Sequence, residues 1–253
     1  MSHLCHRRDF LAGSAALGAG LLLAGRLPAA PYKTTLKKAL IGKPDEATLT
    51  SWKAAGFDGI ESNDRKASVA DAAAARKTAE KNGMRIHSLL FGWANFNSPE
   101  SSQVADDIAA VESSLKAAGA YGAGAVLLVP CKVGGMAMPE PWEFEIDFDE
   151  KTGLVKKVAA GDNAKYQEYI EAQNYATKAS RKAVEKLIPV AEKAGVVIAL
   201  ENVWNNLWVK PALFKTFVAS FDSPSVQAYF DIGNHVKYAP AEEWIRTLGK
   251  LIV

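Results

Sequence analysis

The stretch Gly195-Val196-Val197-Ile198-Ala199-Leu200-Glu201 decides the fold class of this 253-residue chain. It places five apolar residues between a glycine and a carboxylate, which is typical of a strand buried on both faces of a parallel sheet. A long helical pattern at 164–194 precedes it, and another at 210–221 follows it. A buried strand between two helical stretches predicts an α/β architecture with a parallel sheet.

The same alternation extends in both directions along the chain. Further strands are predicted at 36–41, 57–61, 85–91, 125–130, 226–231 and 250–253, and further helices at 46–55, 69–82, 102–121 and 241–248. Strands that alternate with helices predict a (β/α)8 TIM barrel over residues 31–253. Because the sequence stops inside the apolar run Lys250–Val253, we expect a barrel that is truncated near strand 7. An open α/β sheet complete at this length is the alternative.

One connection is much longer than the others. Between Pro130 and about Ala164 there is no helical pattern, but alternating runs at 144–148 and 154–158 flank a turn-like Glu150-Lys151-Thr152-Gly153. We therefore predict a hairpin insert at about 131–163. Because an insert after a strand lies at the C-terminal mouth of a barrel, we expect it to act as a lid; a hairpin with no role in the site is the alternative.

The first 30 residues have the pattern of a twin-arginine signal peptide. Arg7 and Arg8 stand before the apolar run Leu11–Gly25, and a small-residue stretch at 27–30 provides a cleavage site. The apolar run is too short for a comfortable membrane span. We expect export to the periplasm without a membrane anchor; a fortuitous apolar helix is the alternative.

Charge and cysteine content restrict the function after the signal is removed. The chain has 30 Lys and Arg and 28 Asp and Glu, and loss of residues 1–30 leaves 27 of each. A net charge of zero argues against nucleic acid or anionic lipid as partner. Cys5 lies in the signal, so Cys131 is left alone and an intrachain disulfide is excluded in the mature chain.

Carboxylates end two neighbouring predicted strands. Glu201 and Asp231 would converge, because adjacent strands lie about 5 Å apart. A buried carboxylate must be neutral, ion-paired or metal-bound, and no Lys or Arg stands beside either strand end. We therefore predict that Glu201 and Asp231 bind a divalent metal ion, with ion pairs to more distant basic residues as the alternative.

The segments Ala199–Trp204 and Tyr229–His235 resemble the xylose isomerase-like superfamily of barrels, which includes sugar phosphate isomerases and epimerases, ketose 3-epimerases and the AP endonuclease family. The resemblance covers nearly all of the chain after the signal. It implies that Glu201 and Asp231 bind Mn, Mg, Co or Zn, and that Glu201 transfers a proton next to a sugar carbonyl. The family's other two metal ligands, a histidine and a glutamate on later strands, would fall beyond Val253.

The resemblance also suggests substrate contacts. Glu61 and His87 stand on strands where relatives contact substrate, and Trp204 and His235 follow the two motif strands. Aromatic rings stack on the apolar faces of sugars, so Trp93, Trp142, Trp204 and Trp208 are candidates as well. A hydrogen-bonded buried His87, a turn-capping His235 and tryptophans used for packing are the alternatives. Many relatives have a histidine where this chain has Asn234.

The function implied is a metal-dependent isomerase or epimerase that acts on a small-molecule sugar or sugar derivative. A lyase or hydratase acting on keto-glycosides, or a non-catalytic sugar-binding protein, is the alternative. An abasic-site endonuclease is disfavoured by the export signal and the zero net charge, since DNA binding depends on neutralising phosphates.

Overall fold

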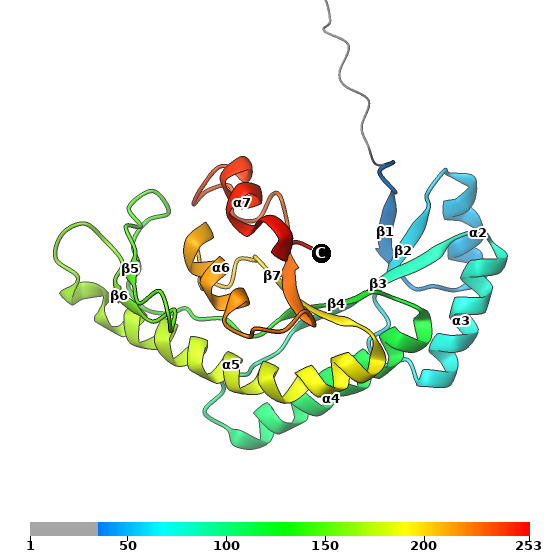
Figure 1. Ribbon diagram of the computed structural model, residues 1–253, viewed down its shortest axis with the longest axis horizontal. Coiled ribbons are helices and arrows are strands. Elements are labelled where there is room, and N and C mark those ends of the chain that lie inside the picture. The colour runs from blue at the N-terminus through cyan, green and yellow to red at the C-terminus, as the bar shows by residue number, and fades with distance from the viewer. Residues whose placement is uncertain (1–34) are drawn as a thin grey trace, which may run out of the picture. The chain divides into compact units, whose positions relative to one another are not determined.

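The computed structural model describes residues 35–253, and residues 37–253 form one compact unit. The predicted signal peptide, with Arg7 and Arg8, lies outside the described residues. Six parallel strands make the main sheet, as the alternating pattern predicts (Figure 1). In spatial order they are β1 (Ala39–Gly42), β2 (Gly59–Ser62), β3 (Arg85–Trp93), β4 (Ala125–Val129), β7 (Val197–Glu201) and β8 (Val226–Tyr229).

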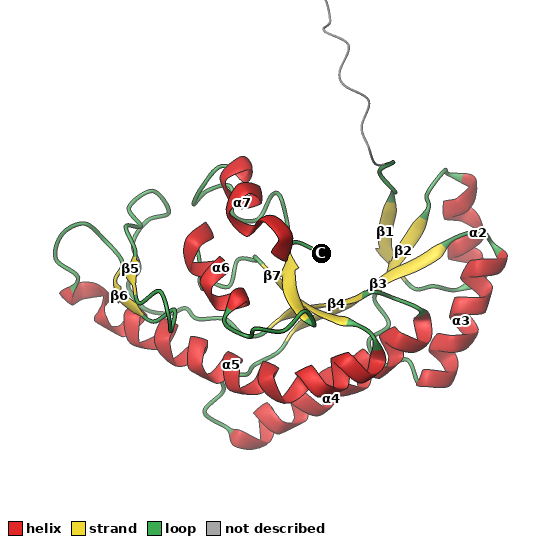
Figure 2. Cartoon of the chain, viewed as in Figure 1, coloured by secondary structure: helices red, strands yellow, loops and turns green. Residues whose placement is uncertain are grey.

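Helices connect successive strands and cover the sheet (Figure 2). They are α2 (Glu46–Ala54), α3 (Val69–Lys81), α4 (Ser101–Tyr121), α5 (Gln167–Ala194), α6 (Pro211–Ala219) and α7 (Ala241–Leu248), with short 3₁₀ turns at Ala164–Tyr166 and Gly249–Leu251. The helices α4 and α5 pack against each other along the outer side of the sheet. No helix in this part of the chain is long and apolar enough to cross a membrane.

The helix ends are determined locally by the sequence. The side chains of Asp45 and Ser68 each accept a backbone N–H from three residues further on, at 2.9 and 3.1 Å, and so cap α2 and α3. Gly122 and Gly195 follow α4 and α5 with φ of +70° and +67°, a left-handed conformation that glycine adopts without strain. All five residues of β4 are buried, because helices cover one face of the strand and the barrel interior lies on the other.

The insert after β4 forms the predicted hairpin, with β5 (Asp147–Phe148) antiparallel to β6 (Val155–Lys157). Asn174 of α5 binds both the N–H and the carbonyl of Val155, at 2.7 and 2.9 Å. Arg181 donates to the carbonyl of Thr152 at 2.8 Å. The hairpin is thus held against an outer helix, and no insert residue lines the cavity described below. Nearer its start the insert contacts the loop after β7, where Asn206 donates to the carbonyl of Val133 at 2.8 Å, and a role of the insert as a lid stays a prediction.

The C-terminal segment departs from the sequence prediction. Instead of a strand over 250–253, a 3₁₀ turn reaches Leu251, and only Ile252 forms a parallel bridge, to Ala228 of β8. Val253 donates its N–H to the carbonyl of Ala228 at 3.0 Å. The segment nevertheless lies beside β8, where the next barrel strand was expected.

Candidate active site

Carboxylates gather at the carboxyl ends of β2, β7 and β8. Glu61 lies in β2, Glu201 ends β7, and Asp231 follows β8 by two residues. Because the strands are parallel, their carboxyl ends meet at one edge, the usual location of a barrel active site. Burial first, and then the charges of Asp231 and Glu61, raise the pKa of Glu201. Asn234 bonds to both Glu201 and Asp231, so these two side chains lie near each other, whereas Glu61 affects Glu201 only through its charge.

Asn234 links the two predicted metal ligands. Its side-chain amide donates to Glu201 Oε1 at 3.2 Å, and its backbone N–H donates to Asp231 Oδ1 at 2.7 Å. Gly233 also donates its backbone N–H to Asp231 Oδ1, at 2.7 Å. Asp231 therefore closes a turn with its own side chain, which explains why β8 ends at Tyr229 rather than at the predicted Asp231.

Asn202 fixes the backbone of Asp231. Its Oδ1 accepts the N–H of Asp231 at 2.6 Å, and its Nδ2 donates to the carbonyl of Asp231 at 2.8 Å. Asn202 is 1% exposed. A buried side chain that makes both bonds replaces the strand pairing that Asp231 lacks, and so holds this carboxylate beside the end of β7.

The electrostatics of the pair fit a cation. Burial, followed by the charges of Asp231 and Glu61, raises the pKa of Glu201 to about 7. Within residues 35–253 no Lys or Arg forms an ion pair with Glu201 or Asp231. Carboxylate oxygens are the donors that hard divalent ions prefer. The described residues do not bring a third His, Cys, Asp or Glu to complete a ligand set.

Glu61 is the centre of a second group of polar residues. It is 5% exposed, and its Oε1 accepts from Ser88 Oγ at 3.0 Å and from Tyr229 Oη at 3.1 Å. Ser88 Oγ also lies 2.9 Å from His87 Nδ1. Burial raises the pKa of Glu61 although both hydroxyls lower it, and it raises the pKa of Tyr229 to about 12.

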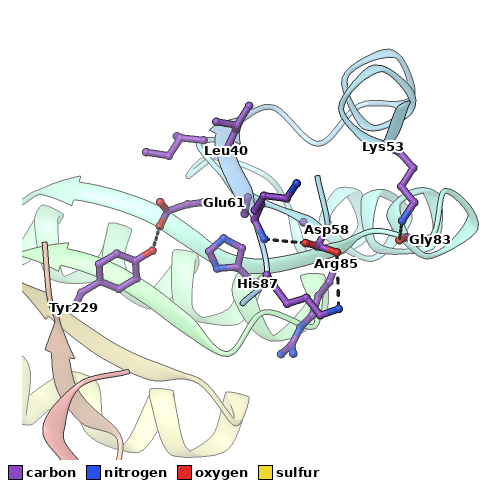
Figure 3. A pocket seen from close by; sticks show the side chains of 13 residues that line it. Leu40, Lys53, Asp58, Glu61, Gly83, Arg85, His87 and Tyr229 are labelled. Carbon is purple, nitrogen blue, oxygen red and sulfur yellow. Dashed lines mark hydrogen bonds and ion pairs between the residues drawn. The ribbon is translucent and has the colours of Figure 1, made fainter. Parts of the chain in front are cut away.

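A cavity of about 650 Å³ extends along the inner face of the first strands to this group. Figure 3 shows Glu61, His87 and Tyr229 together, with Arg85 and Asp58 further along the cavity. Glu201 and Asp231 are not among its lining residues. The cavity therefore reaches Glu61 and Tyr229 from the side of β1 to β3, but it does not extend to Glu201 and Asp231.

Two residues that the sequence suggested as substrate contacts, His235 and Trp208, are buried in the structure. His235 is 1% exposed, packs against Tyr238 and Trp244, and lies 2.8 Å from the carbonyl of Val203 through Nε2. This burial argues against a substrate contact and fits a histidine that stabilises the turn. Trp208 is likewise 1% exposed and stacks on Phe217, so it serves packing.

Trp204 remains a candidate substrate contact at the mouth of the barrel. It is 65% exposed, and its indole N–H donates to the carbonyl of Asn234 at 2.6 Å. This bond places the ring over the turn that holds Asp231. Trp93 and Trp142 are also exposed.

Sequence reasoning missed Ser88, Tyr229 and Asn202. Tyr229 stands two residues before Asp231, and the alternation of side chains along a strand was an available signal that both share a face. Asn202 follows Glu201 directly in the motif. Ser88 gave no such signal, because its position facing Glu61 depends on an irregularity of β3.

Comparisons with known proteins agree with this architecture. A family model described as xylose isomerase-like TIM barrel matches residues 49–253, and a twin-arginine translocation signal model matches residues 5–24, which confirms the predicted signal. Among curated proteins, none matches this sequence.

Several solved structures share the fold. The 3-keto-D-glucoside 4-epimerase of E. coli has a TM-score of 0.64 at 14% identity, over 86% of this chain and 77% of its own. The D-psicose 3-epimerase of Clostridium cellulolyticum H10 has a TM-score of 0.60 at 16% identity, over 86% and 71%. A xylose isomerase domain protein of Planctomyces limnophilus has a TM-score of 0.57 at 11% identity, over 88% and 73%. At these identities the likeness concerns the fold, whereas the family match spans well over half of the chain; the protein therefore belongs to the xylose isomerase-like TIM barrels.

Proposed function

We propose that this protein is a divalent-metal-dependent isomerase or epimerase of a sugar or sugar derivative, exported to the periplasm. The observation that carries the proposal is the pair Glu201 and Asp231, joined through Asn234, with no cationic partner in the described part of the chain. The fold is shared with a 3-keto-D-glucoside 4-epimerase and a D-psicose 3-epimerase. These substrates support the sugar class without selecting a member of it.

Glu201 and Asp231 would both bind the metal ion, and Glu201 would also transfer the proton. Glu201 and Asp231 would hold the metal ion, which when bound polarises the carbonyl and hydroxyl oxygens of a sugar and makes the adjacent C–H more acidic. Glu201 would move the proton. Asn202 and Asn234 would keep both carboxylates in place, and the exposed ring of Trp204 would stack on a sugar face.

Proton exchange with solvent tests this proposal. The protein is incubated in D₂O with Mn²⁺ or Mg²⁺ and a panel of ketoses and 3-keto-glucosides, and loss of the C–H signal next to the carbonyl is followed by ¹H NMR. We expect exchange with at least one substrate, and at least a roughly 100-fold loss in Glu201→Gln, since a proton-transfer group contributes about 10²–10⁴-fold. Glu185→Gln, an exposed position on α5, is the matched control and should exchange like the wild type.

Two results would contradict the proposal. Saturable sugar binding without any exchange would indicate the non-catalytic alternative. Equal exchange in the wild type and in Glu201→Gln would remove Glu201 from the reaction.

A further inference from the structure

A groove of about 520 Å³ lies between the helices α4 and α5 and the loop that precedes α4. The two helices pack side by side on the outer side of the sheet (Figure 1). Apolar side chains line the groove, among them Phe96 and Ala183, each 2% exposed, and Ile108, which is partly buried against the core. No residue of the candidate active site lines it, so the groove is a separate surface.

Lysines give this groove a positive charge. Lys178, Lys182 and Lys186 of α5 line it, whereas no Asp or Glu belongs to its lining. All three lysines are exposed, and within residues 35–253 none of them forms an ion pair with a carboxylate. The lining therefore carries three positive charges and no negative charge, although residues 31–253 as a whole have a net charge of zero.

The three lysines follow one another at intervals of four residues along α5. Because an α-helix rises by about 1.5 Å per residue, neighbouring lysines stand about 6 Å apart and the three together span about 12 Å. A small amphiphile with one anionic group would pair with only one of them. An occupant with acidic groups one helical turn apart would pair with all three.

We propose that the groove between α4 and α5 binds an amphipathic helix of a partner protein, whose acidic residues face the lysines and whose apolar residues pack between α4 and α5. An apolar groove that receives one face of a helix is a common mode of protein recognition. Tyr175 lines the groove one turn before Lys178 and is 53% exposed, and tyrosine is enriched at protein interfaces. None of the described helices of this chain has two acidic residues four positions apart, so a second copy does not match the lysines.

Fluorescence anisotropy with labelled helical peptides tests the proposal. The probe is a synthetic amphipathic peptide of about five helical turns, with three glutamates four residues apart and leucines on the adjoining face. In the control peptide, glutamine replaces these glutamates. We expect the purified protein to bind the acidic peptide saturably and at least roughly 10-fold more tightly than the control, with an affinity that falls as salt is added.

Two variants separate the charge of the groove from its shape. Lys182→Glu should weaken binding of the acidic peptide roughly 10-fold through charge. Ala105→Trp, at an exposed position of α4 that lines the groove, should weaken it to a similar extent by filling the groove without a change of charge. Lys193→Glu, an exposed position of α5 outside the groove, is the matched control and should bind like the wild type. Melting temperatures equal to that of the wild type show that the variants are folded.

Four results would overturn the proposal. The first is absence of binding by the acidic peptide, and the second is an equal loss in Lys182→Glu and Lys193→Glu, because the attraction would then be non-specific. The third is binding of dodecanoate, but not of the peptide, that Ala105→Trp abolishes, which would assign the groove to a small amphiphile. The fourth is a dimer of the protein alone that Lys182→Glu dissociates, which would assign the groove to a second copy.

Discussion

Replacing Glu201 by glutamine should stabilise the metal-free protein at alkaline pH. Burial and the charges of Asp231 and Glu61 raise the pKa of Glu201 from its ordinary value of 4.5 to about 7. In the folded state the group therefore ionises at higher pH than in the unfolded chain. The free energy of unfolding must fall as pH rises from about 4.5 to about 7 and then level off.

The magnitude follows from the size of the pKa shift. One pKa unit corresponds to about 1.4 kcal/mol, so the shift of Glu201 amounts to at most about 3.5 kcal/mol. The side chain is only partly buried, and solvent screening reduces the expected effect to about 2 kcal/mol. Glutamine resembles the protonated acid and does not ionise, so Glu201→Gln should gain about this amount over the wild type between pH 5 and pH 8.

Urea denaturation in the presence of a chelator measures this difference. The wild type and Glu201→Gln are compared at pH 5 and pH 8, and Glu185→Gln controls for loss of a negative charge at an exposed position. We expect the advantage of Glu201→Gln to grow with pH and that of Glu185→Gln to stay constant. A loss of stability in Glu201→Gln of equal size at both pH values would refute the reasoning, because Glu201 would then be a structural partner rather than an uncompensated charge.

Three further predictions concern other parts of the chain. Replacement of Arg7 and Arg8 by lysine should leave the precursor in the cytoplasm, as measured by cell fractionation; export at the normal rate would contradict the targeting role. Asn202→Ala should lower the free energy of unfolding by about 2–3 kcal/mol, because two partly buried backbone groups of Asp231 lose their partners; an unchanged denaturation midpoint would show that water replaces them. Burial raises the pKa of Cys131 to about 12, so a thiol reagent should label it at pH 8 only as fast as the protein unfolds; rapid labelling of the native protein would contradict this.

The strand order and the helix positions could be predicted because the apolar patterns are strong and local. The stretch 196–201 predicts β7 to within one residue, and Gly195 predicts the end of α5. The prediction of a strand over the whole run 250–253 was wrong. Its composition is strand-like, but Gly249, with φ of +53°, begins a 3₁₀ turn, and pairing with β8 starts only at Ile252.

The candidate site was predictable where it depends on strand ends and unpredictable where it depends on irregular backbone. Glu201 and Asp231 meet because adjacent parallel strands end together. The turn that Asp231 closes, and the bulge that turns Ser88 toward Glu61, have no periodic pattern in the sequence. The irregular turn also explains why the prediction of His235 as a substrate contact was wrong. The turn directs the ring of His235 into the core beside Trp244.

Direct measurement of metal binding is the sharpest test of the central claim that Glu201 and Asp231 bind a divalent cation. The chelator-treated protein is titrated with Mn²⁺ by calorimetry, with Glu201→Gln, Asp231→Asn and Glu185→Gln in parallel. We predict saturable binding with a stoichiometry of one in the wild type and in Glu185→Gln, with a higher melting temperature at saturation. Binding should be lost in Glu201→Gln and Asp231→Asn. No binding by the wild type, or equal binding by all four proteins, would contradict the account.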